Sequence, residues 1–215
     1  MSATTRAAVD KFFRQYSVKK YKKGQVLLLN NENPSRIFYL LEGRVKQYDI
    51  SYRGDEIIVN TFRPYTFFPM LNAITGFDNT YCYEADTDIE VIDAPVEKVL
   101  ALLREDSDVA FELLTRLYIG MDGILRRMVH MMGGSTRGRI LHEILLEIRR
   151  FGTPAADGSY EVPLTEGDIA SRIGLSRETV SREISKLKRE KLIRMGTHII
   201  VPDADALEAK LGKSL

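Results

Sequence analysis

The segment 164–203 limits what this chain can fold into more than any other, and it reads LTEGDIASRIGLSRETVSREISKLKREKLIRMGTHIIVPD. Its pattern predicts a helix over 166–173, a tight turn at Gly174 and Leu175, and a second helix that begins after Ser176. The apolar residues are spaced so that the two helices share one buried face, formed by Ile169, Ile173, Leu175, Val180, Ile184 and Leu187.

Capping residues mark the start of both predicted helices. Thr165 and Asp168 are expected to form a capping box at the first helix, in which each side chain bonds the backbone amide of the other residue. Ser176 is expected to cap the second helix, because its hydroxyl can accept a hydrogen bond from a first-turn amide that has no other partner.

The opposite face of the second helix carries side chains that can read DNA bases. Arginine offers a bidentate pair of donors to guanine, and a carboxylate can accept from N4 of cytosine in the major groove. Two short helices joined by a tight turn, with such a face on the second, are typical of a helix-turn-helix. The residues that we expect to contact bases are Arg177, Glu178, Ser181 and Arg182.

Charge near the second helix also favours a nucleic acid. A helix face rich in Arg and Glu is more commonly just solvated, with pairs such as Glu178 and Arg182 stabilising the helix itself. Here the net charge of the whole chain is only +1, yet basic residues outnumber acidic ones locally, which suits a phosphate backbone. The basic residues are Arg172, Arg177, Arg182, Lys186, Lys188, Arg189, Lys191 and Arg194, against Glu178, Glu183 and Glu190.

The segment 194–201 then predicts a two-stranded hairpin with Gly196 in its turn, the wing of a winged helix.

Length and composition are those of an ordinary folded protein. The 215 residues suggest one or two domains, and the 44% hydrophobic content is enough for their cores. The single cysteine, Cys82, excludes an intramolecular disulfide and a four-cysteine zinc or iron–sulfur site within one chain. The first residues lack the apolar run of a signal peptide, and no stretch approaches the roughly 18 apolar residues of a membrane helix. We therefore expect a cytoplasmic protein that does not contact a membrane.

Residues 17–95 read as short strands separated by turns. Runs such as 36–41 and 56–60 are rich in β-branched and aromatic residues, and Gly, Asn, Asp and Pro recur between them, as at 53–55. This spacing predicts a β-sandwich or β-roll, preceded by a helix over 6–15.

One long helix is predicted over 107–132, with Ser107 as its cap. Its apolar residues recur at spacings of four and three, the pattern of a two-stranded coiled coil. We expect this seam to pair two copies of the chain rather than to pack only on the β block, because Leu113, Leu125 and Val129 provide a second apolar flank for that block. The seam consists of Ala110, Leu114, Leu117, Met121, Ile124, Met128 and Met131.

The glycine pair Gly133 and Gly134 is expected to end this helix and to act as a hinge. Ser135 is expected to cap the next helix, over 136–150, and 152–161 reads as a polar loop. The predicted domains are a β-roll sensor domain over 1–105, a dimerisation helix and hinge over 106–134, and a winged helix-turn-helix domain over 135–215.

Over nearly its full length, the chain resembles the CRP/FNR-type transcriptional regulators. The motifs GQVLL and FYLLEGRVK, a Gly-Asp-Glu turn and, most strongly, SRETVSR at 176–182 carry the resemblance. It implies an α+β fold with an N-terminal β-roll of the cyclic-nucleotide-binding type (a jelly roll), a long dimerisation helix and a C-terminal winged helix-turn-helix.

The resemblance also implies roles for the residues of SRETVSR. In that family the positions of Arg177, Glu178 and Arg182 read base edges, and Ser181 stands where the oxygen-responsive branch has a Ser. Arg177 is typical of the cyclic-AMP-responsive branch, which implies a TGTGA-like half-site rather than TTGAT. The residues that we expect to contact phosphates are Thr165, Ser176, Thr179 and Lys186.

The family's nucleotide site is altered in this chain. Its signature is Phe-Gly-Glu and then Arg-Ser/Thr-Ala, in which the Glu binds a ribose hydroxyl and the Arg neutralises the cyclic phosphate. Here Met70 replaces the Glu, Asn79 with Thr80 replaces the Arg motif, and Ile124-Leu125 replace the polar pair that meets the adenine. Losing a bidentate, charge-assisted contact removes the strongest interaction available to that ligand. We therefore expect no response to cyclic AMP and no cofactor, with the effector either an unknown small molecule or none.

Other sensing chemistries find few ligands in the β block. His130, His142 and His198 all lie outside it, which leaves Cys82 as its one thiolate candidate for a heme. Cys82 is expected to be a buried strand residue rather than a redox centre. An aromatic cluster is expected to be core, with an apolar effector pocket as the alternative; it consists of Phe62, Tyr65, Phe67, Phe68, Phe77, Tyr81 and Tyr83.

Together these features predict a homodimeric regulator that reads a pseudo-palindromic operator in double-stranded DNA, with half-sites about 34 Å apart. RNA polymerase is a candidate partner through the loop 152–160, and both activation and repression are compatible. Two alternatives stay open: a constitutive DNA binder with a vestigial effector site, and a sensor whose helix-turn-helix docks on protein. The sequence has no clustered nucleophile and base, phosphate-binding Gly loop or metal-ligand spacing, so we do not expect an enzyme.

Overall fold

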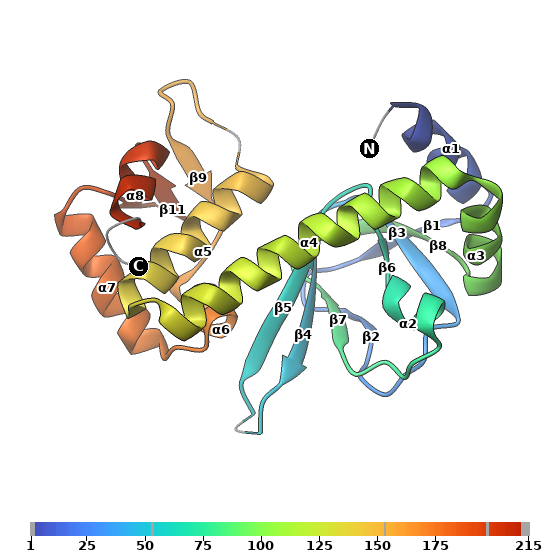
Figure 1. Cartoon of the computed structure of the whole chain (residues 1–215), viewed down its shortest axis with the longest axis horizontal. Coiled ribbons are helices and arrows are strands. Elements are labelled where there is room, and N and C mark those ends of the chain that lie inside the picture. Colours follow the sequence, from blue (N-terminus) through green and yellow to red (C-terminus); the bar gives the residue numbers. More distant parts are fainter. Residues whose placement is uncertain (1–2, 53, 153, 197, 212–215) are drawn as a thin grey trace. The chain divides into compact units, whose positions relative to one another are not determined.

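The computed structural model describes residues 3–52, 54–152, 154–196 and 198–211 (Figure 1). The chain divides into two compact units, Met1–Tyr118 and Ile119–Leu215, and the boundary falls inside one long helix, α4 (Ser107–Gly133). Each unit has hydrophobic clusters of its own. Predicted features at Arg53, Thr153 and Thr197, and at the ends of the predicted terminal domains, lie outside the described residues.

The first unit is built on two four-stranded antiparallel sheets. One has the order β1 (Val18–Tyr21), β8 (Ile89–Pro95), β3 (Arg36–Glu42) and β6 (Phe67–Phe68); the other has the order β2 (Val26–Leu28), β7 (Cys82–Ala85), β4 (Val45–Ile50) and β5 (Glu56–Phe62).

Strand β3 shows why both faces of its sheet are apolar. Phe38 and Leu40 belong to a cluster that strands of both sheets share, whereas Ile37 and Tyr39 pack in a second cluster with the helices. Successive side chains of a strand point to opposite faces, so a strand buried on both faces reads as a continuous apolar run. These layers confirm the predicted β-roll.

Helices α1 (Ala3–Phe13), α2 (Met70–Thr75), α3 (Val96–Glu105) and the start of α4 complete the first unit. Phe13 of α1 stacks on Tyr39 of β3 with ring centroids 4.7 Å apart. The helix that the sequence predicts over 6–15 is confirmed with other bounds: it begins three residues earlier, at Ala3, and ends at Phe13. The cap predicted at Ser107 is wrong, because Oδ1 of Asp106 accepts from the backbone amides of Asp108 and Val109, both at 3.1 Å.

The second unit contains α5 (Thr136–Phe151), α6 (Glu166–Ile173), α7 (Arg177–Arg189) and α8 (Ala204–Leu211) around a small antiparallel sheet. The sheet has the order β10 (Arg194–Met195), β11 (Ile199–Val201) and β9 (Tyr160–Val162). The hydroxyl of Ser135 accepts from the Gly138 amide at 3.0 Å, which confirms the predicted cap.

The wing sheet corrects one prediction. The segment 152–161 was expected to be a loop, but its end forms β9, so the wing has three strands instead of two. Val162 is buried in the core and Tyr160 packs on it, while Glu161 between them is exposed. This alternation is that of a strand with one buried face, over too few residues to stand out from a loop.

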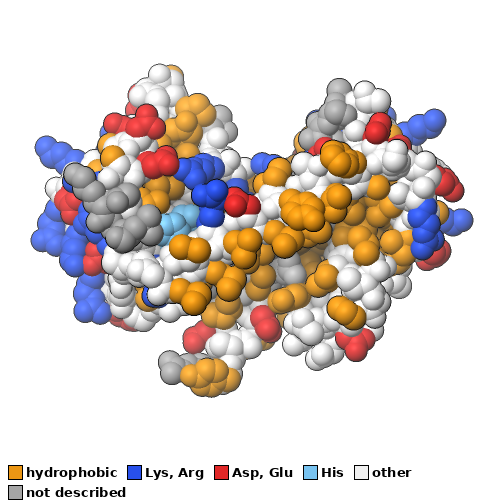
Figure 2. Space-filling view, viewed as in Figure 1, with side chains coloured by type: hydrophobic (Ala, Val, Ile, Leu, Met, Phe, Trp, Pro, Cys, Tyr) orange, Lys and Arg blue, Asp and Glu red, His pale blue; other side chains and the backbone are white. Residues whose placement is uncertain are grey.

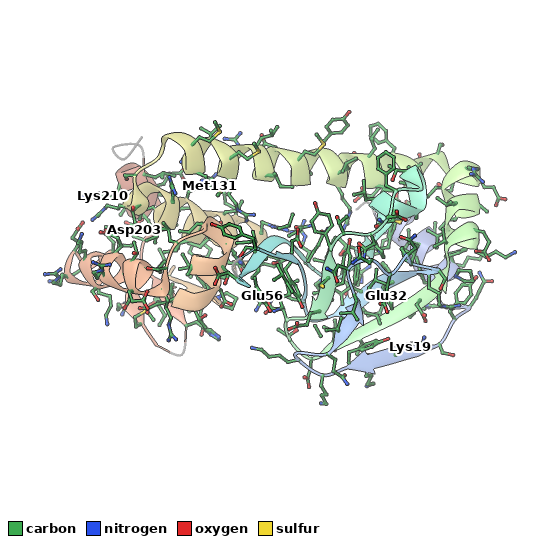
Figure 3. All side chains as sticks on the ribbon, turned by 90° about the horizontal axis from the view of Figure 1, so that it is seen from below. Lys19, Glu32, Glu56, Met131, Asp203 and Lys210 are labelled. Atoms are coloured by element: carbon green, nitrogen blue, oxygen red, sulfur yellow. The ribbon has the colours of Figure 1, made fainter. Side chains whose placement is uncertain are left out.

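Helix α4 carries a long exposed apolar face (Figures 2 and 3). Most of the predicted seam is exposed, as Leu117 at 55% and Met128 at 49% illustrate. Leu113 packs on the first unit as expected. Leu125 and Val129 belong to the second unit, so their predicted packing on the β block stays a prediction. Both are exposed, at 56% and 62%, and extend the apolar face together with Phe111, Tyr118 and Met132.

The glycine pair follows this face. Gly133 is the last residue of α4, and a Cβ on Gly134 would lie 2.5 Å from the carbonyl oxygen of His130. Any larger residue at 134 would therefore push the turn between α4 and α5 apart.

Candidate nucleic-acid interface

The α6–α7 pair is built by the capping residues that the sequence predicts. The Thr165 hydroxyl accepts from the Asp168 amide at 3.1 Å, and Oδ2 of Asp168 accepts from the Thr165 amide at 2.7 Å, which completes the capping box. Gly174 ends α6 in the left-handed region with φ 64°. The Ser176 hydroxyl then accepts from the Thr179 amide at 3.3 Å and starts α7. The predicted helix-turn-helix is confirmed.

An apolar core fixes the orientation of α7. Val180, Ile184 and Leu187 are buried together with Ile169 and Ile173 of α6. The hydroxyl and charged side chains on the other face of α7 therefore point towards solvent. Figure 2 shows Lys and Arg side chains gathered on this part of the surface.

That face borders an open groove. It is lined by Thr136, Glu166, Arg177, Glu178, Thr179, Ser181, Arg182, Glu183, Ser185, Lys186 and Arg189. All four residues predicted to contact bases are therefore together, with Arg177, Glu178 and Arg182 exposed and Ser181 half-buried. Contact of these residues with bases stays a prediction.

The two arginines of this face are free to bind. Arg182 donates only to the backbone carbonyl of Glu178, at 3.3 Å, and neither Arg177 nor Arg182 forms an ion pair within the described part of the chain. The backbone amide of Glu178 and the Ser176 hydroxyl hold the pKa of the Glu178 carboxyl below its usual range. The face therefore presents two guanidinium groups and one carboxylate at neutral pH.

Of the residues predicted to contact phosphates, Thr179 and Lys186 line this groove, and Thr165 and Ser176 are the caps of α6 and α7. The Thr165 and Ser176 hydroxyls are engaged in capping, and that of Ser176 also lies 3.0 Å from the Thr179 hydroxyl. Lys186 is exposed and pairs with Glu183. An exposed pair of this kind is worth about 1 kcal/mol or less, so phosphate can displace it.

Arg172 is a correction to the basic residues that the sequence counted as suited to a phosphate backbone. Its side chain is only 6% exposed, and Nη1 donates to Glu147 at 2.8 Å and to Glu143 at 3.2 Å. The two carboxylates raise the pKa of Arg172, although burial works against the charged form. Its charge is used inside the protein and is not available to DNA.

Three groove residues were not assigned to this interface from the sequence: Thr136, Glu166 and Ser185. Ser185 follows Arg182 by three positions, so helical spacing was enough to place it on the same face. Thr136 comes from the start of α5, and only the fold brings it to the groove. Near this groove, the guanidinium of Arg137 binds both oxygens of Glu190 at 2.7 and 2.6 Å, tying α5 to the end of α7.

The residues predicted to replace the family's nucleotide ligands lie in the first unit. Asn79 is fully buried, and its amide nitrogen donates to the carbonyl oxygens of Leu29 at 2.9 Å and Tyr81 at 2.8 Å. Met70 packs on the helix-facing cluster, and Thr80 is exposed. Neither Met70 nor Asn79 directs a free polar group towards a ligand.

The aromatic cluster is largely core. Phe68 stacks on Phe62 and on Tyr83, with ring centroids 4.7 and 5.7 Å apart, and Phe68 is 1% exposed. Phe77 is the exception at 71% exposure. Cys82 is 3% exposed in β7, as expected for a structural cysteine.

Two further properties concern the described residues only. No described helix is both long and apolar enough to cross a membrane. The described His, Cys, Asp and Glu side chains include no group of three or more that could hold a metal ion.

Each of the two units matches a known domain family. The family model for a cyclic nucleotide-binding domain matches residues 18–106, and that for a Crp-like helix-turn-helix domain matches 138–210. The global nitrogen regulator of Nostoc sp. is 29% identical over 206 residues, which cover 90% of this chain and 91% of that protein.

Solved structures of similar proteins have the same fold as this chain. A transcriptional regulator of the CRP/FNR family from Thermus thermophilus is 25% identical and superimposes with a TM-score of 0.73 over 92% of this chain and 99% of that one. FixK2 from Bradyrhizobium japonicum, 21% identical, has the same fold, with a TM-score of 0.76 over 90% of this chain and 96% of that one.

Proposed function

Because the chain belongs to the CRP/FNR family of transcription regulators, we propose that it is a homodimer that reads a pseudo-palindromic, TGTGA-like operator without needing cyclic AMP. The observation that carries this proposal is the exposed set Arg177, Glu178 and Arg182 on one face of a capped helix. An arginine with no internal ion pair keeps its donors for O6 and N7 of guanine.

Non-specific affinity is assigned to the groove margin. Lys186, Arg189 and the hydroxyl of Thr136 surround the base-reading set and suit phosphate oxygens. Contacts of this kind fix the register of a protein on the duplex, and their strength falls with salt.

The exposed face of α4 supports the dimer. Monomeric proteins rarely leave such a continuous apolar surface in water, and the seam repeats at coiled-coil spacing. Apart from the adjoining backbone of α4 itself, Cβ atoms added at Gly120 and Gly123 would meet no described atom within 4 Å, so a close partner helix fits there. Two seams paired in this way would present two copies of α7 to one face of the DNA.

Independence from cyclic AMP rests on Met70 and Asn79. The family's phosphate-binding Arg is replaced by an amide whose donors are spent on two backbone carbonyls. A constitutive regulator, or one with a different effector, fits this position better than a cyclic-AMP sensor. In either case Gly133 and Gly134 would serve as the hinge, the cytoplasm would be the site of action, and RNA polymerase would be a candidate partner.

The test is fluorescence anisotropy of the ligand-free protein on a palindromic TGTGA duplex and on a scrambled duplex, at physiological salt. Tight binding to the first duplex alone supports the proposal. Equal binding to both, followed by failure to enrich any sequence from random DNA, would contradict sequence-specific reading and favour a helix-turn-helix that docks on protein.

A further inference from the structure

A buried chain of charges crosses three helices of the second unit. Glu143 of α5 is at its centre and is 1% exposed. One side of it meets Arg127 of α4, whose Nε donates to Oε2 of Glu143 at 3.2 Å. The other side meets Arg172 of α6, which also binds Glu147.

This arrangement costs more than packing alone requires. Removing charged groups from water is expensive, and well-packed apolar residues are often at least as stabilising as a buried ion pair. The α5–α6 contact already has an apolar core through Ile140, Ile144 and Ile169. What the charges add is directional, because Glu143 bonds guanidinium groups from two helices that the apolar core does not join to each other.

The link also crosses the glycine pair. Arg127 precedes Gly133 and Gly134 in the chain, and Glu143 follows them. Without a lateral contact, the backbone freedom of two consecutive glycines would let α5 rotate about the end of α4. The Arg127–Glu143 ion pair and the stacking of His130 of α4 on His142 of α5, with ring centroids 3.9 Å apart, oppose that rotation, and α7 moves with α6 because the two share one core.

We propose that Arg127 and Glu143 are positioning residues for operator recognition, which set the angle of α6 and α7 relative to the seam on α4 and thereby the separation of the two recognition helices in the dimer. This inference rests on the proposed function. Arg127 does not line the groove beside α7, and its side chain is only 13% exposed, whereas the neighbouring seam residues Ile124 and Met131 are 41% and 38% exposed.

The matched variants are Arg127→Gln and Arg126→Gln. Arg126 is the neighbouring arginine of the same helix, but it is 61% exposed and pairs with Asp122 of its own helix. Arg127→Gln leaves Arg172 with both of its carboxylates, so the contact between α5 and α6 survives. Arg127→Lys keeps the charge and serves as the rescue variant.

The experiment measures binding of the full-length dimer to palindromic TGTGA duplexes whose half-sites are moved by about one or two base pairs from a separation of about 10 base pairs. The same titrations on a duplex with one half-site report the reading face alone. Thermal unfolding and sedimentation confirm that each variant is folded and dimeric.

We expect the wild type and Arg126→Gln to show one sharp optimum of separation. Arg127→Gln should lose about tenfold at that optimum and show a flat profile, with half-site binding unchanged, and Arg127→Lys should restore part of the optimum. An unchanged profile for Arg127→Gln would overturn the proposal. Equal losses on every duplex, half-site included, would also overturn it, because they indicate a general loss of fold. A wild type that binds no TGTGA duplex selectively would instead reject the proposed function, and this inference with it.

Discussion

Two regions of this chain are predicted to correspond to ligand-binding positions of its family, and they differ in the partners of their polar groups. On α7, Arg177 and Arg182 have no ion pair in the described chain and extend into solvent. In the β-roll, Asn79 is predicted to replace the arginine with which the family binds a phosphate, and its amide nitrogen donates to the carbonyl oxygens of Leu29 and Tyr81. The guanidinium donors on α7 are therefore available to a ligand, whereas the amide donors of Asn79 are already hydrogen-bonded within the protein.

This difference teaches how to recognise a site that still binds. A polar group that is satisfied inside the protein gains little from a ligand, because binding would exchange one hydrogen bond for another. A group left exposed on a rigid, capped helix can add a new bond without reorganisation. The comparison therefore predicts function at α7 and a structural role at Asn79.

The largest effect is expected from separating the two copies of the reading face. Met128→Glu places a charge in the apolar seam of α4, where Met128 is 49% exposed. The dimer should dissociate in sedimentation, and operator affinity should fall by more than about 100-fold, towards that of one half-site. Arg126→Glu is the control, since the Arg126 side chain is 61% exposed on α4 and lies outside the apolar seam. Equal dissociation by both variants would show that the seam has the wrong register.

Removing one base-reading side chain tests the first region directly. Arg182→Ala should cost about 1–3 kcal/mol of discrimination, or about 10- to 100-fold, at one base pair of the half-site. Binding to a scrambled duplex should change little. Lys188→Ala, an exposed residue of α7 that does not line the groove, should leave discrimination intact. Undiminished selectivity in Arg182→Ala would remove Arg182 from the reading set.

His142 is a third case, a buried side chain with one ring nitrogen that is not hydrogen-bonded to any described residue. It is 6% exposed, its ring stacks on that of His130 at 3.9 Å, and Nε2 has no hydrogen-bond partner among the described residues. Burial first, and then His130, Arg127 and Arg149, lower the pKa of His142 to about 4, against an opposing effect of Glu143.

The lowered pKa of His142 determines how the free energy of unfolding depends on pH. The unfolded chain takes up the proton near pH 6.5 and the folded chain only near pH 4, so this stabilisation is complete above pH 6.5 and is lost between these values as the pH falls. The unfolding free energy of the wild type should fall by up to about 3 kcal/mol more than that of His142→Gln over this window. Parallel curves for the wild type and His142→Gln would show that His142 is not held neutral.

The second region predicts stability rather than binding. Asn79→Ala should lower the unfolding free energy by about 1–3 kcal/mol in chemical denaturation, because two backbone carbonyls lose their donor. Thr80→Ala, next to it and exposed, should have little effect. A neutral Asn79→Ala would mean that its amide bonds do not hold the β-roll together.

The smallest effect is expected at the groove margin. Lys186→Ala should weaken binding to matched and scrambled duplexes alike, and should reduce the slope of log affinity against log salt by about 0.9 for each lost phosphate contact. Lys98→Ala on α3, in the other unit, should leave the slope unchanged. A loss confined to the matched duplex would make Lys186 a base reader.

The sequence predicted the helix-turn-helix almost residue by residue, because capping residues and helical spacing act within a few positions. It misassigned Arg172, whose partners Glu143 and Glu147 lie 29 and 25 residues earlier and reach it only in the folded unit. Strand β9 escaped for the same reason, since its three residues are defined by pairing with β11. Leu125 and Val129 show the limit of periodicity, which identifies an apolar face but not what covers it.

The most direct measurement compares operator binding with and without cyclic AMP. Anisotropy of the wild type on the palindromic TGTGA duplex and its scrambled control would be titrated at physiological salt, once without ligand and once with saturating cyclic AMP. Our account predicts selective binding in both series, with superimposable curves. Selective binding that appears only with cyclic AMP would contradict it, because the position of Asn79 would then still serve a working nucleotide site.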